Sequence, residues 1–117
     1  MSKSNFNRIV SHVLDAYAEE HIAEQMAVLA ANPDWAEGHY NLAQLYRTQG
    51  RQREAKEQLL IALEKDATLA EAHIALGEMY ILEGDLPSAR QYAEFAAALG
   101  NKRLLEQMQR YRADGED

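Results

Sequence analysis

The sequence predicts an all-α protein built from stacked helical hairpins. Residues 36–69 and 70–103 align with each other at an offset of 34 residues. A fixed period of this size is typical of repeat proteins in which each unit contacts its neighbours. Glycine stands inside both copies, at Gly50 and Gly84, where a residue that tolerates positive φ can end one helix before the next begins. We therefore expect each copy to fold as a helix–turn–helix unit.

Residues that favour helix starts and ends give the expected helix bounds. Asn32-Pro33-Asp34 and Asp85-Leu86-Pro87 are typical helix starts, since Asn and Asp are favoured N-caps and Pro is favoured at the first helical position. Ala43 and Gly77 are small, which lets two helix axes approach closely where they cross. Gly100 closes the second copy. The expected helices span residues 34–48, 52–65, 68–82 and 86–99.

The flanking segments are less regular. Residues 5–17 and 20–31 each carry an apolar stripe with helical spacing, but the two stripes are out of phase. The phase break predicts a degenerate helical hairpin over residues 2–35, and a single long kinked helix accounts for the same pattern. At the other end, residues 104–112 form an amphipathic pattern that predicts a capping helix, which repeat arrays need at a solvent-facing end. Residues 113–117 are expected to be a polar tail.

The spacing and residue types of the two copies resemble the tetratricopeptide repeat. The residues that carry the resemblance are Leu42, Ala43, Tyr46, Gly50, Ala55 and Ala62 in the first copy, and Leu76, Gly77, Tyr80, Gly84, Ala89 and Ala96 in the second. His39 and His73 stand where the family usually has Trp or another aromatic, and Ala67 replaces a frequent Pro. The resemblance implies a right-handed α-α superhelix of about seven helices, ending in the cap.

The resemblance also implies a binding surface, because the first helix of each tetratricopeptide hairpin lines a concave groove. The groove residues would be Glu37, Tyr40, Asn41, Gln44, Arg47 and Thr48 in the first repeat, and Glu71, Ile74, Ala75, Glu78, Ile81 and Leu82 in the second. The implied function is an adaptor that captures a helical or extended segment of another protein.

The residue types in this groove predict the chemistry of its partner. Ile74, Ile81 and Leu82 would form an exposed apolar patch, unless the cap or a neighbouring helix covers them. Glu71 and Glu78 favour a partner with Lys or Arg, so we expect an apolar peptide with basic flanks. Family members that bind the acidic tails of chaperones present basic grooves, and the glutamates here would repel a carboxylate.

An alternative hypothesis is a self-associating structural protein. The apolar stripe of residues 6–17, or the apolar patch of the second repeat, would then be buried against another copy in a homo-oligomer. Two full repeats make a thin stack, and pairing would extend it.

The bulk composition excludes several classes of function. The net charge of −7 does not suit a surface for nucleic acid or anionic membranes. Residues 9–46 contain six acids and no Lys or Arg, which favours a basic or neutral partner, although a solvated acidic face gives the same pattern. The basic cluster of Arg47, Arg51, Arg53 and Lys56 does not recur in the second copy, so we interpret it as a solvated ridge with intrahelical pairs. No segment resembles a signal peptide or membrane span, and a cytoplasmic protein is expected.

Catalysis and cofactor binding are not expected. The chain lacks cysteine, which excludes thiol chemistry, and it has no phosphate-binding glycine loop or recognisable catalytic arrangement. His39 and His73 occupy equivalent repeat positions, so packing between helices explains them more simply than metal binding. We expect no metal, no cofactor and no enzymatic activity.

Overall fold

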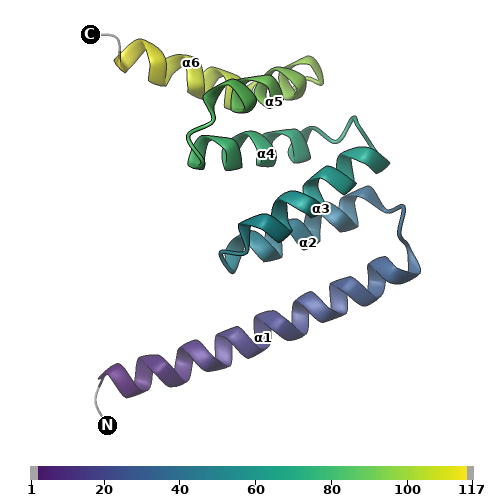
Figure 1. The fold of residues 1–117 in the computed structure, drawn as a ribbon, viewed down its shortest axis with the longest axis vertical. Coiled ribbons are helices and arrows are strands. Elements are labelled where there is room, and N and C mark those ends of the chain that lie inside the picture. The colour runs from purple at the N-terminus through teal and green to yellow at the C-terminus, as the bar shows by residue number, and fades with distance from the viewer. Residues whose placement is uncertain (1–2, 116–117) are drawn as a thin grey trace.

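The computed structural model describes residues 3–115, and within that range the chain forms six α-helices and no strand (Figure 1). The helices are α1 (Lys3–Ala31), α2 (Ala36–Thr48), α3 (Gln52–Lys65), α4 (Ala70–Leu82), α5 (Leu86–Ala98) and α6 (Arg103–Gly115). Helices α2 and α3 form one hairpin and α4 and α5 a second, stacked between α1 at one end and α6 at the other (Figure 1). The prediction of an all-α stack is confirmed, with six helices in place of about seven.

The glycines inside the repeats have the conformation that the sequence predicts. Gly50 and Gly84 have φ angles of 73° and 80°, in the left-handed region where a side chain would be strained. The backbone N–H groups of Arg51 and Asp85 then donate back to the carbonyls of Tyr46 and Tyr80, each at 2.9 Å. Both hairpins therefore reverse direction by the same helix-ending turn.

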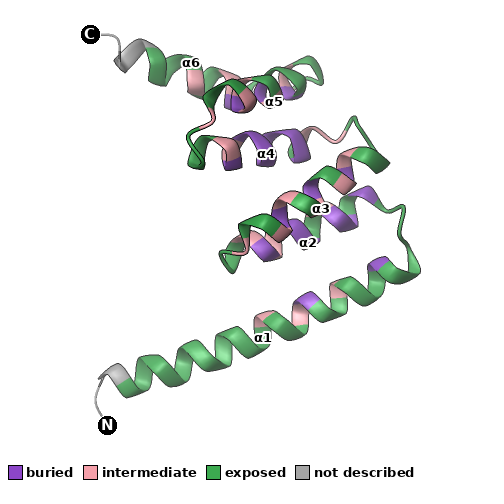
Figure 2. Ribbon diagram, viewed as in Figure 1, coloured by how far each residue is buried: buried purple, intermediate pink, exposed green. Residues whose placement is uncertain are grey.

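The main hydrophobic core lies where α2, α3 and α4 meet (Figure 2). Leu59 and Leu76 are fully buried there, and the alanines that face them leave room for close helix approach. Gly77 serves the same purpose on the other side of α4, since a Cβ at this position would lie 2.5 Å from Leu104 Cδ2. The absence of a side chain at Gly77 therefore makes room for α6 as well as for α5.

The predicted hairpin over residues 2–35 is wrong, because the structure has the single helix α1 over almost all of that segment. No Gly or Pro occurs between Lys3 and Ala31, so nothing in the sequence interrupts the helix. Asn32 and Pro33 end α1 and do not start α2: the Asn32 side chain donates to the carbonyl of Val28 at 3.1 Å. Helix α2 begins later, at Ala36.

Helix α6 covers the segment expected to be a cap and extends beyond it. Its backbone is helical from Arg103 through Gly115, and so enters the segment 113–117 that was expected to be a polar tail. The last two residues of that tail lie outside the described range, as do Met1 and Ser2. Within the described part of the chain, no helix has both the length and the apolar character needed to cross a bilayer.

The start of α5 gives the protein an acid-sensitive cap. The Asp85 carboxylate accepts hydrogen bonds from the Ser88 backbone N–H at 3.1 Å and from the Ser88 hydroxyl at 2.7 Å. These bonds, the hydroxyl bond first, lower the pKa of Asp85 below its ordinary value of 3.8. The stabilisation is therefore complete above the pKa of the unfolded chain, and it is lost as the pH falls through the lower pKa of the folded state.

We expect Asp85→Asn to keep the cap but to flatten the dependence of stability on pH in the acid range. Asn is as good an N-cap as Asp, but it carries no proton that titrates. The measurement is the midpoint of thermal unfolding, followed by circular dichroism from neutral to acidic pH. Ser88→Ala removes only the hydroxyl donor, so the change of its unfolding midpoint with pH should lie between those of the wild type and Asp85→Asn. Equal slopes for wild type and Asp85→Asn would show that the cap does not contribute.

Candidate interaction surface

A row of five polar side chains runs across α2, α4 and α6. Gln44 Nε2 donates to the Tyr40 hydroxyl at 3.3 Å, and Arg47 Nη1 donates to Gln44 Oε1 at 3.1 Å. Arg47 Nη1 also lies 3.6 Å from Glu78 Oε1. Arg103 Nη1 lies 3.7 Å from the other oxygen of the same carboxylate. We call Tyr40, Gln44, Arg47, Glu78 and Arg103 the polar row.

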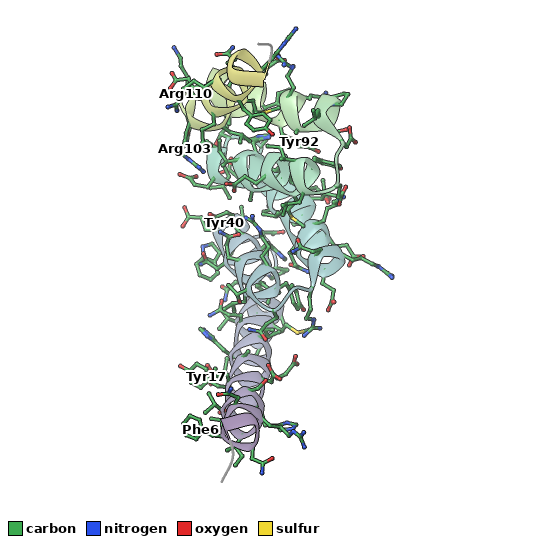
Figure 3. All side chains as sticks on the ribbon, turned by 90° about the vertical axis from the view of Figure 1, so that its left-hand side faces the viewer. Phe6, Tyr17, Tyr40, Tyr92, Arg103 and Arg110 are labelled. Carbon is green, nitrogen blue, oxygen red and sulfur yellow. The ribbon has the colours of Figure 1, made fainter. Side chains whose placement is uncertain are left out.

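The repeat places the polar row on one side of the molecule. Residues 40, 44 and 47 follow the spacing that puts side chains on one helix face. Gln44 and Glu78 are equivalent positions in the two copies, and the ion pair between Arg47 and Glu78 shows that these faces of α2 and α4 lie close together. Tyr40 and Arg103 point toward the same side of the stack in Figure 3. The row therefore follows the first helices of both hairpins and continues onto α6.

The electrostatics of this surface change along its length. Burial raises the pKa of Tyr40, and the nearby Glu71 carboxylate raises it further. The Tyr40 hydroxyl is therefore neutral at physiological pH and available for hydrogen bonding. Glu37 and Glu71 are exposed, and among the described side chains neither pairs with a cation. Glu37 and Glu71 thus add negative charge near Tyr40, whereas Arg47 and Arg103 share the single carboxylate of Glu78.

The structure brings into contact four of the twelve residues that the resemblance assigns to a groove. Tyr40, Gln44, Arg47 and Glu78 contact one another through the polar row. The exposed residues of the same helix faces are Glu37, Asn41, Thr48, Glu71, Ile81 and Leu82.

Ile74 corrects the expected apolar patch. It is only 3% exposed and belongs to a buried cluster between α4, α5 and α6. The other buried members are Ala93, Ala96 and Leu104. Ala75 is buried as well, in the main core. The alternative in which the terminal helix covers part of the patch is therefore right for Ile74. The side chains left exposed are Ile81 at 36% and Leu82 at 74%.

Arg103 was not identified from the sequence. It lies at the start of α6, outside the groove positions of the repeat pattern, so no periodic signal marks it. Its approach to Glu78 depends on the way α6 folds back over α4. A lone arginine at the start of an amphipathic helix gives no indication of that contact.

The basic cluster at the first hairpin turn is engaged with acidic side chains. Arg51 pairs with Glu54 and with Glu19, the latter at 2.9 Å. Arg53 pairs with Glu57 along α3 at 3.6 Å, as the ridge interpretation predicts. Lys56 Nζ lies 2.6 Å from Glu83 Oε1 and 4.3 Å from the centre of the Tyr80 ring. Arg51 and Lys56 thus connect α3 with neighbouring helices, whereas the Arg53 pair lies within α3. Because all three cations are already paired, they do not favour a phosphate-binding surface.

The two repeat histidines contact the turns between hairpins. His39 Nε2 donates to the carbonyl of Pro33 at 2.8 Å, and His73 Nε2 donates to the carbonyl of Ala67 at 2.9 Å. His39 Nδ1 also lies 2.8 Å from the side-chain amide of Gln58. Both rings thus serve the packing role expected for them. Among the described residues, no group of three or more His, Asp or Glu side chains could hold a metal ion.

Comparisons with known proteins agree on the fold. The model of the tetratricopeptide repeat matches residues 36–60 and 70–94. The structure is similar to the crystal structure of MamA, with a TM-score of 0.70 and 19% sequence identity over 80% of this chain and 55% of that chain. The chain thus spans about half the length of that protein, and at this identity the likeness shows the fold alone. No curated protein matches the sequence. Residues 36–60 and 70–94 are therefore two tetratricopeptide repeats.

Proposed function

We propose that the protein is an interaction adaptor that holds a segment of another protein against the polar row. Tetratricopeptide arrays are generally protein-binding scaffolds without catalytic activity, and this chain has two such repeats. The observation that carries the proposal is the connected row itself. Tyr40, Gln44, Arg47, Glu78 and Arg103 fix one another across three helices, which preorganises hydrogen-bonding groups for a ligand.

The partner we propose is an apolar helical or extended peptide with basic flanks. Leu82 and the exposed part of Ile81 offer apolar contact at the C-terminal end of α4. Glu37 and Glu71 carry negative charge that is not neutralised by neighbouring cations, so Lys or Arg of a partner would be attracted there. Tyr40 and Asn41 are placed to bond the backbone or polar side chains of the bound segment. The burial of Ile74 confines the apolar contact to one end of the surface.

This proposal predicts a specific outcome in a selection from a random peptide display library. We expect enriched peptides to combine apolar residues with Lys or Arg. The affinity of an enriched peptide should fall at least about tenfold in Leu82→Glu, since one apolar contact is lost and a charge is added. Glu71→Lys should weaken binding as well, by repelling the basic flank.

The matched control is Glu94→Lys on α5, which makes the same charge change at an exposed position of a second helix. It should leave affinity unchanged, measured by fluorescence anisotropy with a labelled peptide. Equal affinity of wild type, Leu82→Glu and Glu71→Lys for every enriched peptide would show that the surface does not bind peptides.

A further inference from the structure

The first half of α1 carries an apolar stripe that no other part of the described chain covers. Its members are 38–68% exposed: Phe6, Ile9, Val10, Val13, Leu14 and Tyr17. The second half of α1 behaves differently, because Ile22 and Leu29 are buried against the main core. Figure 2 shows this contrast as an almost wholly exposed first half and a partly buried second half. We call the six residues the α1 stripe.

A helix with such a stripe needs a partner. Packing of an apolar face supplies most of the stability of a helix in a protein, and helices of this length are marginal when isolated in water. The first half of α1 extends beyond the hairpins and gains no such packing from its own chain (Figure 1). Exposed contiguous apolar surface on a water-soluble fold usually marks an interaction site.

The spacing within the stripe shows what kind of partner fits. Phe6, Val10, Val13 and Tyr17 are separated by four, three and four residues, which is the spacing along the contact line of paired helices. The order of side-chain types is the same when read from either end. Phe6 corresponds to Tyr17, and Val10 to Val13, about a centre between Ser11 and His12. An antiparallel second copy of α1 would therefore meet aromatic with aromatic and valine with valine.

The charges along α1 favour the same partner in the same orientation. The basic residues of α1 are Lys3 and Arg8, near its start, whereas the acidic residues Asp15, Glu19, Glu20 and Glu24 follow later in the helix. An antiparallel copy places the basic end of each helix beside the acidic half of the other. A parallel copy would set like charges side by side, which is unfavourable.

We propose that two copies of this chain associate through the α1 stripe as an antiparallel helix pair. Pairing about the centre between Ser11 and His12 brings residue 3 of one copy level with residue 20 of the other. The overlap therefore ends before α2, and the polar rows of both copies stay outside it. Phe6, Tyr17 and Tyr40 point to the same side in Figure 3. Because the two helices would run in opposite directions, the two polar rows would lie at opposite ends of the pair.

The first test is molecular mass by light scattering, measured over a wide range of protein concentrations. We expect the wild type to change from monomer to dimer as concentration rises. Val13→Glu should raise the dissociation constant at least about 100-fold, since each dimer loses two buried side chains and gains two charges. Leu82→Glu is the matched control, because it makes the same kind of change on α4 and should leave the dimer intact.

The second test reports the orientation of the two helices. Because the chain has no cysteine, an introduced cysteine is the only thiol that can react in each variant. Phe6→Cys and Tyr17→Cys are made as separate proteins, which leaves the four central stripe residues unchanged. A short bis-maleimide, which adds one cysteine thiol at each end, should join the two variants when they are mixed and should not join either variant to itself. In an antiparallel pair, the two copies of position 6 are separated by eleven helical residues, about 16 Å along the axis.

Each result decides the proposal. A wild type that stays monomeric at every concentration overturns it. A dimer that dissociates with Leu82→Glu but not with Val13→Glu overturns it too, because another surface would then be responsible. Cross-linking within a single variant would rule out the antiparallel orientation. Circular dichroism of the variants checks that both remain helical, as expected for exposed positions.

Discussion

Ile74→Glu is expected to destabilise the stack severely by disrupting the packing of its C-terminal helices. The side chain is almost fully buried between α4, α5 and α6, so the substitution removes an apolar contact and places a carboxylate in an apolar cluster. Loss of a buried Ile costs about 2–5 kcal/mol, and burial of an unpaired charge adds to this. Since small domains are stable by only about 5–15 kcal/mol, we expect a severe loss of folded protein.

The measurement is the urea midpoint of unfolding, followed by circular dichroism. Leu82→Glu is the control, since it introduces the same charge on the same helix at a site that is 74% exposed. Surface substitutions of this kind usually change stability by less than about 0.5 kcal/mol. If Ile74→Glu had the same urea midpoint as the wild type, α6 would not cover Ile74. The exposed apolar patch would then include Ile74, as expected from the sequence.

Tyr46→Ala is expected to destabilise the other end of the stack by about 3–5 kcal/mol, the usual range for a buried aromatic side chain. Tyr46 is 6% exposed and packs in the main core. Its hydroxyl lies 3.8 Å from the sulfur of Met26 on α1, and the Arg51 guanidinium lies 4.7 Å from the centre of its ring. The ring therefore joins α1, α2 and the start of α3.

Tyr46→Phe separates the packing of the ring from the contribution of the hydroxyl. It keeps the aromatic ring and the contact with Arg51, and it loses only a weak hydrogen bond to sulfur. We expect it to lower the free energy of unfolding by less than about 1 kcal/mol. Chemical denaturation of both variants gives the comparison. Similar losses in Tyr46→Ala and Tyr46→Phe would contradict the central role of the ring.

The hairpins could be predicted from the sequence because their pattern residues meet local physical demands. Gly50 and Gly84 supply the positive φ of the turns, and Ala43 and Ala55 are fully buried where helices cross. The starts of α2 and α4 differ from the expected bounds by two residues, at Ala36 and Ala70. Turn glycines and small residues at helix crossings depend only on short segments of the chain. Each occurs in both repeats, so the sequence gives two indications of the same structure.

The burial of Ile74 could not be predicted because it depends on a distant part of the chain. Helix α4 is apolar on nearly every side, so its periodicity does not show which face is exposed. The position of α6 decides it, and the same is true of the contact between Arg103 and Glu78. The resemblance to the repeat implied which side chains share a helix face, but it did not imply these contacts between separate elements.

The sequence left two alternatives for α1, a hairpin or a single long kinked helix, and the structure has a single helix. The apolar stripe changes face near Ala18, and this change was interpreted as a break in the helix. In the structure the backbone continues and only the surroundings change, since Ile22 and Leu29 face the core while the first half extends beyond it. A shift of apolar phase without Gly or Pro thus indicates a change of neighbour and not a turn.

The bonds from His39 to Pro33 and from His73 to Ala67 have a consequence for the cooperativity of unfolding. Repeat arrays lose their units one at a time when the coupling between units is weak. Each imidazole ties the first helix of a hairpin to the loop that precedes it, at 2.8 and 2.9 Å. Unwinding α2 or α4 therefore releases the end of the preceding helix as well. The array is short, but its units are linked at both junctions, so they are expected to melt together in one transition.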